Sequence, residues 1–142
     1  MCLFNKLYNL FKKKKICVSK KEKNILVAED DFGQRLMIQK ILEKEGYDLL
    51  LAENGSQALV LARSRKPDLI LLDVVMPEID GHEVCRQLKE DESTKNIPVI
   101  FLTAADTPND IIEHFDLGAD MHLTKPIDAR ELIAQIEITF EN

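Results

Sequence analysis

The chain has 142 residues, 45% of them hydrophobic, and a formal net charge of -6 at pH 7. This length supplies one compact core and is too short for two ordinary domains, so we expect a single domain with an extension. No apolar run approaches the roughly 20 residues of a membrane span, and the first segment lacks the order of a secretory signal, so we expect neither export nor membrane insertion. Three scattered cysteines indicate neither a disulfide framework nor a zinc site and fit a reducing, cytoplasmic setting.

The first 24 residues differ sharply in charge from the rest. They carry eight lysines and one glutamate, a charge of +7, whereas residues 25–142 carry 11 basic and 24 acidic side chains, a charge of -13. This break predicts a boundary near Asn24 between a basic N-terminal extension, residues 1–24, and a folded domain, residues 25–142. The acidity of the domain argues against specific binding of nucleic acid.

The extension is also amphipathic. Its apolar residues share one helical face, and Lys12 to Lys15 follow at once. The apolar residues are Leu3, Phe4, Leu7, Leu10 and Phe11. This pattern is compatible with peripheral membrane contact through residues 1–15, in which each lysine contributes on the order of 1 kcal/mol. Docking on a partner and a disordered tail are open alternatives.

From Asn24 onward, five short apolar runs alternate with longer amphipathic segments. The runs are residues 25–28, 49–52, 69–72, 99–102 and 121–123. Helix starts between them are indicated by Asp31 with Gln34, Asp80 with Glu83, Thr107 with Pro108 and Asp128 with Glu131. Strict alternation of strand and helix predicts a parallel sheet of five strands with helices on both faces. Ligands of such sheets bind beyond the carboxyl ends of the strands.

Candidate site residues follow four of the five runs. Glu29, Asp30 and Asp31 come after the first, Asp73 after the third, Thr103 after the fourth and Lys125 just past the fifth. Any one of them taken singly is best explained as a helix cap or a turn residue, and Asp31 is such a cap. All of them together at one edge predict a functional site.

The residue types suit phosphoryl transfer assisted by a divalent cation. Crowded carboxylates repel one another, and a hard, oxygen-preferring ion such as Mg²⁺ removes that cost. Glu29, Asp30 and Asp73 are the expected ligands. Asp73 is then the expected nucleophile, while the hydroxyl of Thr103 and the charge of Lys125 suit the oxygens of a phosphoryl group.

Four segments of the body resemble the motifs of response-regulator receiver domains. They are ILVAEDD at 25–31, LLDVVMPEIDG at 71–81, FLTAAD at 101–106 and LTKPI at 123–127. The resemblance implies a flavodoxin-like, doubly wound sheet in the order 2-1-3-4-5 with five helices, Glu29 and Asp30 as the acidic pair, and Asp73 as phosphoacceptor. It also implies Mg²⁺, Thr103 and Lys125 at the phosphoryl group, a main-chain carbonyl ligand from Val75, and a cis peptide bond before Pro126.

The resemblance further implies how the protein signals. A phosphohistidine on a sensor kinase or a phosphotransfer protein donates to Asp73, and a change of shape is read by a protein target on the face formed by residues 107–140. The domain promotes its own phosphotransfer and slow dephosphorylation and is otherwise no enzyme. Because the chain stops after the last expected helix, we expect a single-domain regulator without a DNA-binding effector.

Two positions depart from the pattern of the family. Glu29 stands where aspartate is more frequent, which lengthens one arm of the acidic pair. His122 occupies the place of the switch aromatic, usually tyrosine or phenylalanine, that moves together with the threonine. His82, His114 and His122 are scattered along the chain, so we expect surface or half-buried histidines and no metal site.

Three other functions remain as alternatives. An aspartyl-phosphate hydrolase uses a similar nucleophile but typically needs a second carboxylate two residues on, where this chain has Val75. A non-phosphorylated interaction module would not need the acidic pair, the threonine and the lysine. A flavin binder of the same topology would need a phosphate-cradling loop, which the sequence lacks.

Overall fold

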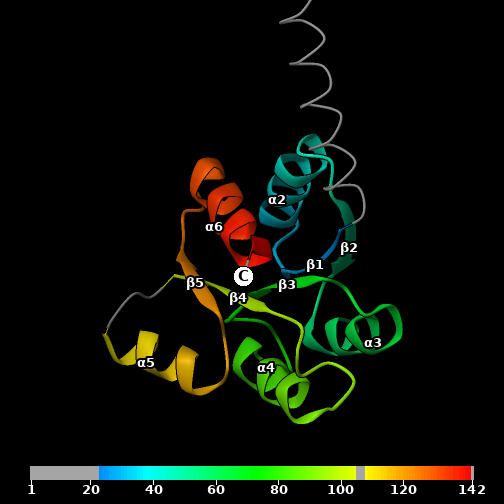
Figure 1. Ribbon diagram of the computed structural model, residues 1–142. Coiled ribbons are helices and arrows are strands. Elements are labelled where there is room, and N and C mark those ends of the chain that lie inside the picture. Colours follow the sequence, from blue (N-terminus) through cyan, green and yellow to red (C-terminus); the bar gives the residue numbers. More distant parts are fainter. Residues whose placement is uncertain (1–22, 105–107, 142) are drawn as a thin grey trace, which may run out of the picture.

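The computed structural model describes residues 23–104 and 108–141, and the predicted extension lies almost entirely outside them. The described strands are β1 (Asn24–Ala28), β2 (Asp48–Ala52), β3 (Leu69–Asp73), β4 (Val99–Thr103) and β5 (Met121–Thr124). The helices are α2 (Phe32–Lys44), α3 (Gly55–Arg65), α4 (Gly81–Glu90), α5 (Pro108–Asp116) and α6 (Ala129–Glu141). The sheet is parallel throughout in the order β2-β1-β3-β4-β5, which confirms the predicted fold (Figure 1).

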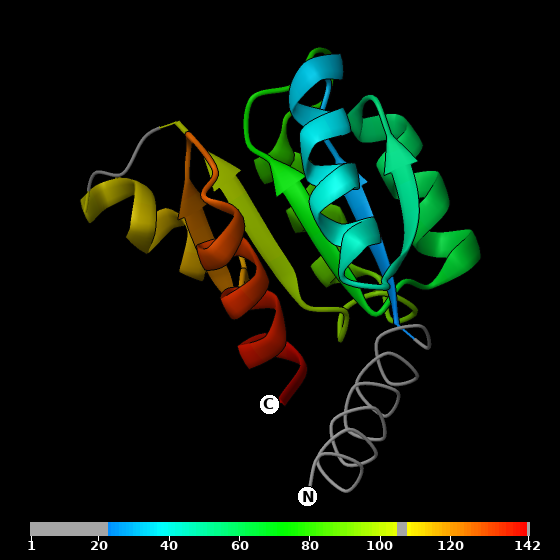
Figure 2. The same cartoon turned by 90° about the horizontal axis from the view of Figure 1, so that it is seen from above.

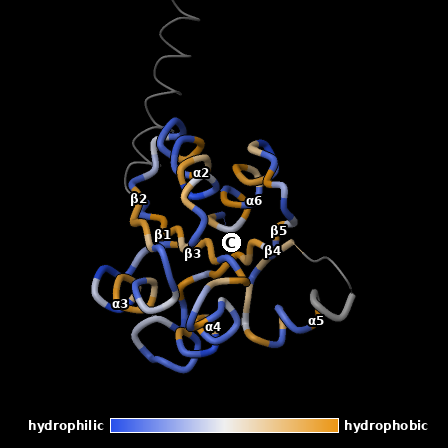
Figure 3. The backbone as a smooth tube through the Cα atoms, turned by 180° about the vertical axis from the view of Figure 1, so that it is seen from behind, coloured by the Kyte–Doolittle hydropathy of each residue, from blue (hydrophilic) through white to orange (hydrophobic). Residues whose placement is uncertain are grey.

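The helices form one layer on each face of the sheet. Helices α2 and α6 cover one face, and α3, α4 and α5 cover the other (Figure 1). Alternate residues of the central strands point to opposite sides, so Leu26 and Leu72 pack with α3 and α4 while Val27 and Leu71 pack with α2 and α6. Burial on both faces explains why these strands form nearly continuous apolar runs, which are orange in the hydropathy colouring of Figure 3.

Side chains at the helix starts fix where the helices begin. Asp31 accepts a hydrogen bond from the main-chain N–H of Gln34 at 2.8 Å, and Asp80 accepts one from Glu83 at 2.9 Å, as predicted. Asn54 caps α3 in the same way, which the sequence analysis did not anticipate. The predicted cap at Thr107 lies outside the described residues.

The turn after β3 brings α4 against the end of that strand. The N–H of Gly81 donates to the carbonyl oxygen of Val74 at 2.8 Å. A Cβ atom at Gly81 would lie 2.2 Å from the carbonyl oxygen of Asp73, so only glycine fits here. Gly81 therefore seats the first turn of α4 directly on the main chain of Asp73.

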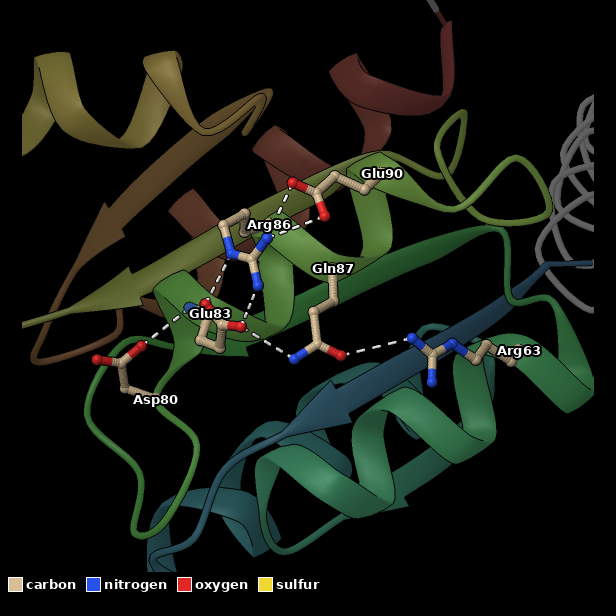
Figure 4. Close-up of polar contacts among 6 residues, drawn as sticks. All are labelled: Arg63, Asp80, Glu83, Arg86, Gln87 and Glu90. Carbon is tan, nitrogen blue, oxygen red and sulfur yellow. Dashed lines mark hydrogen bonds and ion pairs between the residues drawn. The ribbon is translucent and has the colours of Figure 1, made fainter.

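Exposed ion pairs organise the outer surface of α4 (Figure 4). Arg86 donates hydrogen bonds to the carboxylates of Glu83 and Glu90, and the contact with Arg86 lowers the pKa of Glu83 to about 2. Gln87 accepts a hydrogen bond from Arg63 of α3 at 3.5 Å. Pairs this exposed contribute little to stability, so we interpret the network as a solvated helix surface.

No helix within residues 23–104 and 108–141 is long and apolar enough to cross a membrane.

Candidate functional site

Three carboxylates meet at the carboxyl edge of the sheet. Glu29 and Asp30 follow β1, and Asp73 is the last residue of β3, the neighbouring strand. One carboxylate oxygen from each residue lies within 4.8 Å of the other two. Glu29 and Asp73 are buried, whereas Asp30 is exposed. In the described part of the chain, these residues form the only group of three or more histidine, cysteine or acidic side chains that is placed to hold a metal ion.

Lys125 supplies a positive charge to the same cluster. Its Nζ atom lies 2.7 Å from Oε1 of Glu29 and 3.3 Å from Oδ2 of Asp73. The peptide bond to Pro126 is cis, as the resemblance implied. The lysine therefore contacts two of the three carboxylates and partly neutralises their charge.

The electrostatics of the cluster are shaped by burial. Burial raises the pKa of Glu29, and the neighbouring carboxyl group of Asp73 raises it further, while Lys125 opposes both effects. Burial alone would lower the pKa of Lys125, but the hydrogen bond to Glu29 and the charges of Asp73 and Glu29 outweigh it, so the pKa of Lys125 is raised. A nearby cation therefore favours the ionised form of Glu29.

Thr103 and Val75 border the cluster. Thr103 is the buried last residue of β4, and the N–H of Lys125 donates to its carbonyl oxygen at 2.7 Å. Because Asp73 is paired with Leu102, Thr103 lies one residue closer to the carboxyl edge of the sheet. The N–H of Val75 donates to Oδ1 of Asp73 at 3.3 Å, and the Val75 side chain is 73% exposed.

Arg35 belongs to the site although the sequence analysis missed it. From α2, its Nη1 atom donates to the main-chain oxygen of Glu29 at 2.8 Å and to that of Asp30 at 3.4 Å. Its Nη2 atom lies 3.5 Å from the carboxylate of Glu53, and its side chain is buried. Arg35 shares the buried face of α2 with Ile38 and Leu42, and a charged residue on an apolar helical face is the signal that could have revealed it.

The histidines are less scattered in space than in sequence. His114 of α5 is only 2% exposed, which corrects the expected surface or half-buried placement. Its ring centroid lies 5.2 Å from that of His82, 5.7 Å from that of His122 and 4.5 Å from that of Phe101. These side chains meet because α4, α5 and β5 all pack around β4. His122 is paired with Phe101 in the sheet and also contacts Phe115 of α5.

A doubly wound parallel sheet with an acidic cluster and a lysine at its carboxyl edge is the architecture of a phosphoryl-accepting signalling domain. The comparisons give the family: the response regulator receiver domain matches residues 25–137, and the chain belongs to this family.

Two individual relatives also support membership of this family. The phosphate regulon transcriptional regulatory protein PhoB of Pseudomonas aeruginosa is 45% identical over 115 residues, which cover 81% of this chain and 50% of PhoB. Protein PilH of the same species is 40% identical over 112 residues, which cover 79% of this chain and 93% of PilH. The chain thus spans about half the length of PhoB and nearly all of PilH.

Solved structures agree with the fold. The receiver domain of the sensor histidine kinase PA1611 from Pseudomonas aeruginosa, solved with a magnesium ion in its active-site cleft, superposes with a TM-score of 0.75. It is 30% identical, and the match covers 81% of this chain and 94% of that domain.

Proposed function

We propose that this receiver domain accepts a phosphoryl group on Asp73 from a phosphohistidine of a sensor kinase or phosphotransfer protein, in a Mg²⁺-dependent reaction. The observation that carries the proposal is the contact of Asp73 with Lys125 inside a cluster that also contains Glu29 and Asp30. A nucleophilic carboxylate needs nearby positive charge before it can approach an anionic phosphoryl group.

The donor set fits magnesium. Carboxylate oxygens are the ligands that this ion prefers, and Glu29, Asp30 and Asp73 would hold it together with the main-chain carbonyl oxygen of Val75. When bound, the ion would neutralise carboxylate charge and stabilise negative charge on the phosphoryl group. The magnesium ion in the cleft of the PA1611 receiver domain supports this choice of metal.

The transfer step uses the chain's own groups. A carboxylate oxygen of Asp73 forms a bond to phosphorus while the bond between phosphorus and the donor imidazole nitrogen breaks, and the imidazole leaves with the electron pair and takes up a proton. Lys125, already 3.3 Å from Asp73, would then pair with a phosphoryl oxygen, and the hydroxyl of Thr103 would donate to another.

Signalling would follow from local rearrangement. We infer that Thr103 and His122 act as switch residues and that a protein target reads the face formed by residues 107–140. His122 lies in β5 and packs against His114 and Phe115 of α5, so a movement of its ring would disturb the packing of that helix. We also infer a cytoplasmic setting and a domain that spans residues 25–142 after a basic extension of residues 1–24.

Labelling with a small phosphodonor such as acetyl phosphate tests the proposal. Wild-type protein should gain an acid-labile phosphoryl group only in the presence of Mg²⁺, and Asp73→Asn should abolish it. The exposed Asp116 provides a matched control, because Asp116→Asn changes charge equally while leaving the cluster intact. Labelling that survives in Asp73→Asn would overturn the assignment, and continuous turnover of the donor without a labelled protein would favour the hydrolase alternative.

A further inference from the structure

A cavity of about 450 Å³ opens at the end of the molecule opposite the acidic cluster. It lies where β4 and β5 begin and α6 ends, and its walls include Pro98, Asp120, Met121, Ile138 and Phe140. The side chain of Ile138 is 46% exposed although it is large and apolar. The cavity therefore combines apolar walls with a carboxylate, and the proposed phosphoryl transfer makes no use of it.

The N-terminal extension joins the domain beside this cavity. Figure 2 shows the start of β1 and the end of α6 at the same edge of the sheet. The Nζ atom of Lys23 lies 5.4 Å from the ring centroid of Phe140, a residue that lines the cavity. Tyr47 also contacts Phe140, with its ring centroid 5.9 Å from that of Phe140. Lys23, the first described residue after the extension, thus lies beside a residue that lines the cavity.

The charges of the two parts are complementary. Residues 1–22 contain seven lysines and one glutamate, a charge of +6, whereas residues 25–142 have a charge of -13. Asp120 lines the cavity, and the exposed Glu141 lies at the end of α6 one residue after Phe140. The lysines of the extension would therefore be attracted to this end of the domain at low and moderate salt.

The apolar pattern and the length of the extension are also compatible with a contact between the extension and the cavity. Its apolar residues at positions 3, 4, 7, 10 and 11 recur at helical spacing and could cover Met121 and Ile138. Residues 12–22 are long enough to lead back to the cavity, since an extended chain spans roughly 3.3 to 3.6 Å per residue. A short tether also keeps the local concentration of the segment on the order of millimolar, so even weak contacts would be populated.

We propose that residues 1–11 of the same chain dock on this cavity, with the lysines of residues 12–21 lying near Asp120 and Glu141. The occupant is intramolecular because Lys23, at which the tether joins the domain, lies beside a residue that lines the cavity. Docking would cover Ile138 of α6, part of the face on which the proposed function places the protein target. That single consequence rests on the proposed function, whereas the docking itself does not.

Paramagnetic relaxation in the full-length chain tests the docking without any measurement of phosphorylation. A spin label can be attached at Cys2 in a Cys17→Ser background, because Cys85 is buried and burial raises the pKa of its thiol to about 11. The label should broaden the amide signals of Met121, Ile138 and Phe140. It should leave those of Ser56 and Val60 sharp, since these line a separate cavity on α3.

Two substitutions sharpen the result. Ile138→Lys should abolish the broadening, since it places a charge in the apolar wall and repels the lysines. Val60→Lys should leave it unchanged, because Val60 is also a large exposed apolar residue but lies on α3, away from the predicted contact. Added salt should weaken the broadening.

Three outcomes would overturn the proposal. The first is equal broadening on α3 and at the cavity, and the second is no broadening at the cavity at all. The third is transfer of the effect from a labelled chain to an unlabelled, isotope-enriched chain in a mixed sample, which would make the occupant a second copy. Binding of anionic vesicles by the extension with no effect at the cavity in their absence would assign the segment to membranes instead.

Discussion

The guanidinium group of Arg35 donates a hydrogen bond to the main-chain oxygen of Glu29 at 2.8 Å, so α2 holds the loop that carries two of the three clustered carboxylates. Partners that orient metal ligands typically change metal affinity by roughly ten- to hundred-fold when they are removed. We expect Arg35→Lys to weaken Mg²⁺ binding by about that factor, because lysine retains the charge but has one nitrogen, which cannot contact the loop carbonyl oxygens and Glu53 at the same time.

Calorimetric titration with MgCl₂ measures this effect. Arg65→Lys is the matched control, because Arg65 is exposed at the end of α3. Unchanged Mg²⁺ affinity in Arg35→Lys would show that the loop keeps its geometry without the arginine.

Magnesium should also stabilise the fold. Binding that relieves repulsion among Glu29, Asp30 and Asp73 would add about 2.7 kcal/mol to the free energy of unfolding at a hundred-fold excess over Kd. For a domain of this size that corresponds to a rise in Tm of roughly 10 °C. Thermal unfolding with MgCl₂ and with EDTA tests it, and Asp30→Asn should reduce the difference. An identical Tm in both buffers would favour the interaction-module alternative.

The raised pKa of Glu29 predicts a pH dependence of the metal-free protein. A carboxyl group whose pKa is higher in the folded state binds more protons there than in the unfolded state. Its contribution to stability is therefore fully present below the ordinary pKa of 4.5 and is lost as the pH rises through the raised value. Chemical unfolding in EDTA across this range should show stability falling with pH in the wild type. Glu29→Gln should flatten that slope, and an unaltered slope would contradict a raised pKa at this residue.

The exposed side chain of Val75 predicts a long-lived aspartyl phosphate. Two residues past Asp73, it offers no hydrogen bond to an attacking water, and Ala105, two residues past Thr103, is also apolar, although it lies outside the described residues. Val75→Asn should accelerate loss of phosphate about five-fold, since one added hydrogen bond is worth about 1 kcal/mol in the transition state. Release of phosphate from purified, labelled protein measures the rate. The Asn variant should fold normally because the site is 73% exposed, and equal decay rates would refute the explanation.

Much of this fold could be predicted from sequence because its signals are local. Apolar runs bounded by caps such as Asp31 and Asp80 indicated strands and helix starts, and Asp73 and Thr103 were recognisable because each directly follows an apolar run. The order of the strands came from the family resemblance, since local pattern alone does not fix which strands are neighbours.

The contacts that were missed depend on distant parts of the chain. Lys125 and Glu29 are separated by 96 positions, so their 2.7 Å contact depends on the segments after β1 and β5 meeting at the carboxyl edge of the sheet, which no local pattern specifies. The role of Arg35 depends on the main-chain oxygen of Glu29, which lies within its reach only in the folded chain. The neighbouring rings of His82, His114 and His122 likewise result from three elements that pack around Phe101.

Because Gly81 has no Cβ atom, the start of α4 packs directly against the end of β3. The main chain of Gly81 lies so close to the Asp73 carbonyl that any shift of that residue must carry the first turn of α4 with it. The ring of the next residue, His82, contacts those of Phe101 and His114. A shift of α4 would therefore disturb the packing of His114, which belongs to α5. A movement of Asp73 could thus reach α5 by two routes, one through Gly81 and His82 of α4 and the other through Thr103 of β4.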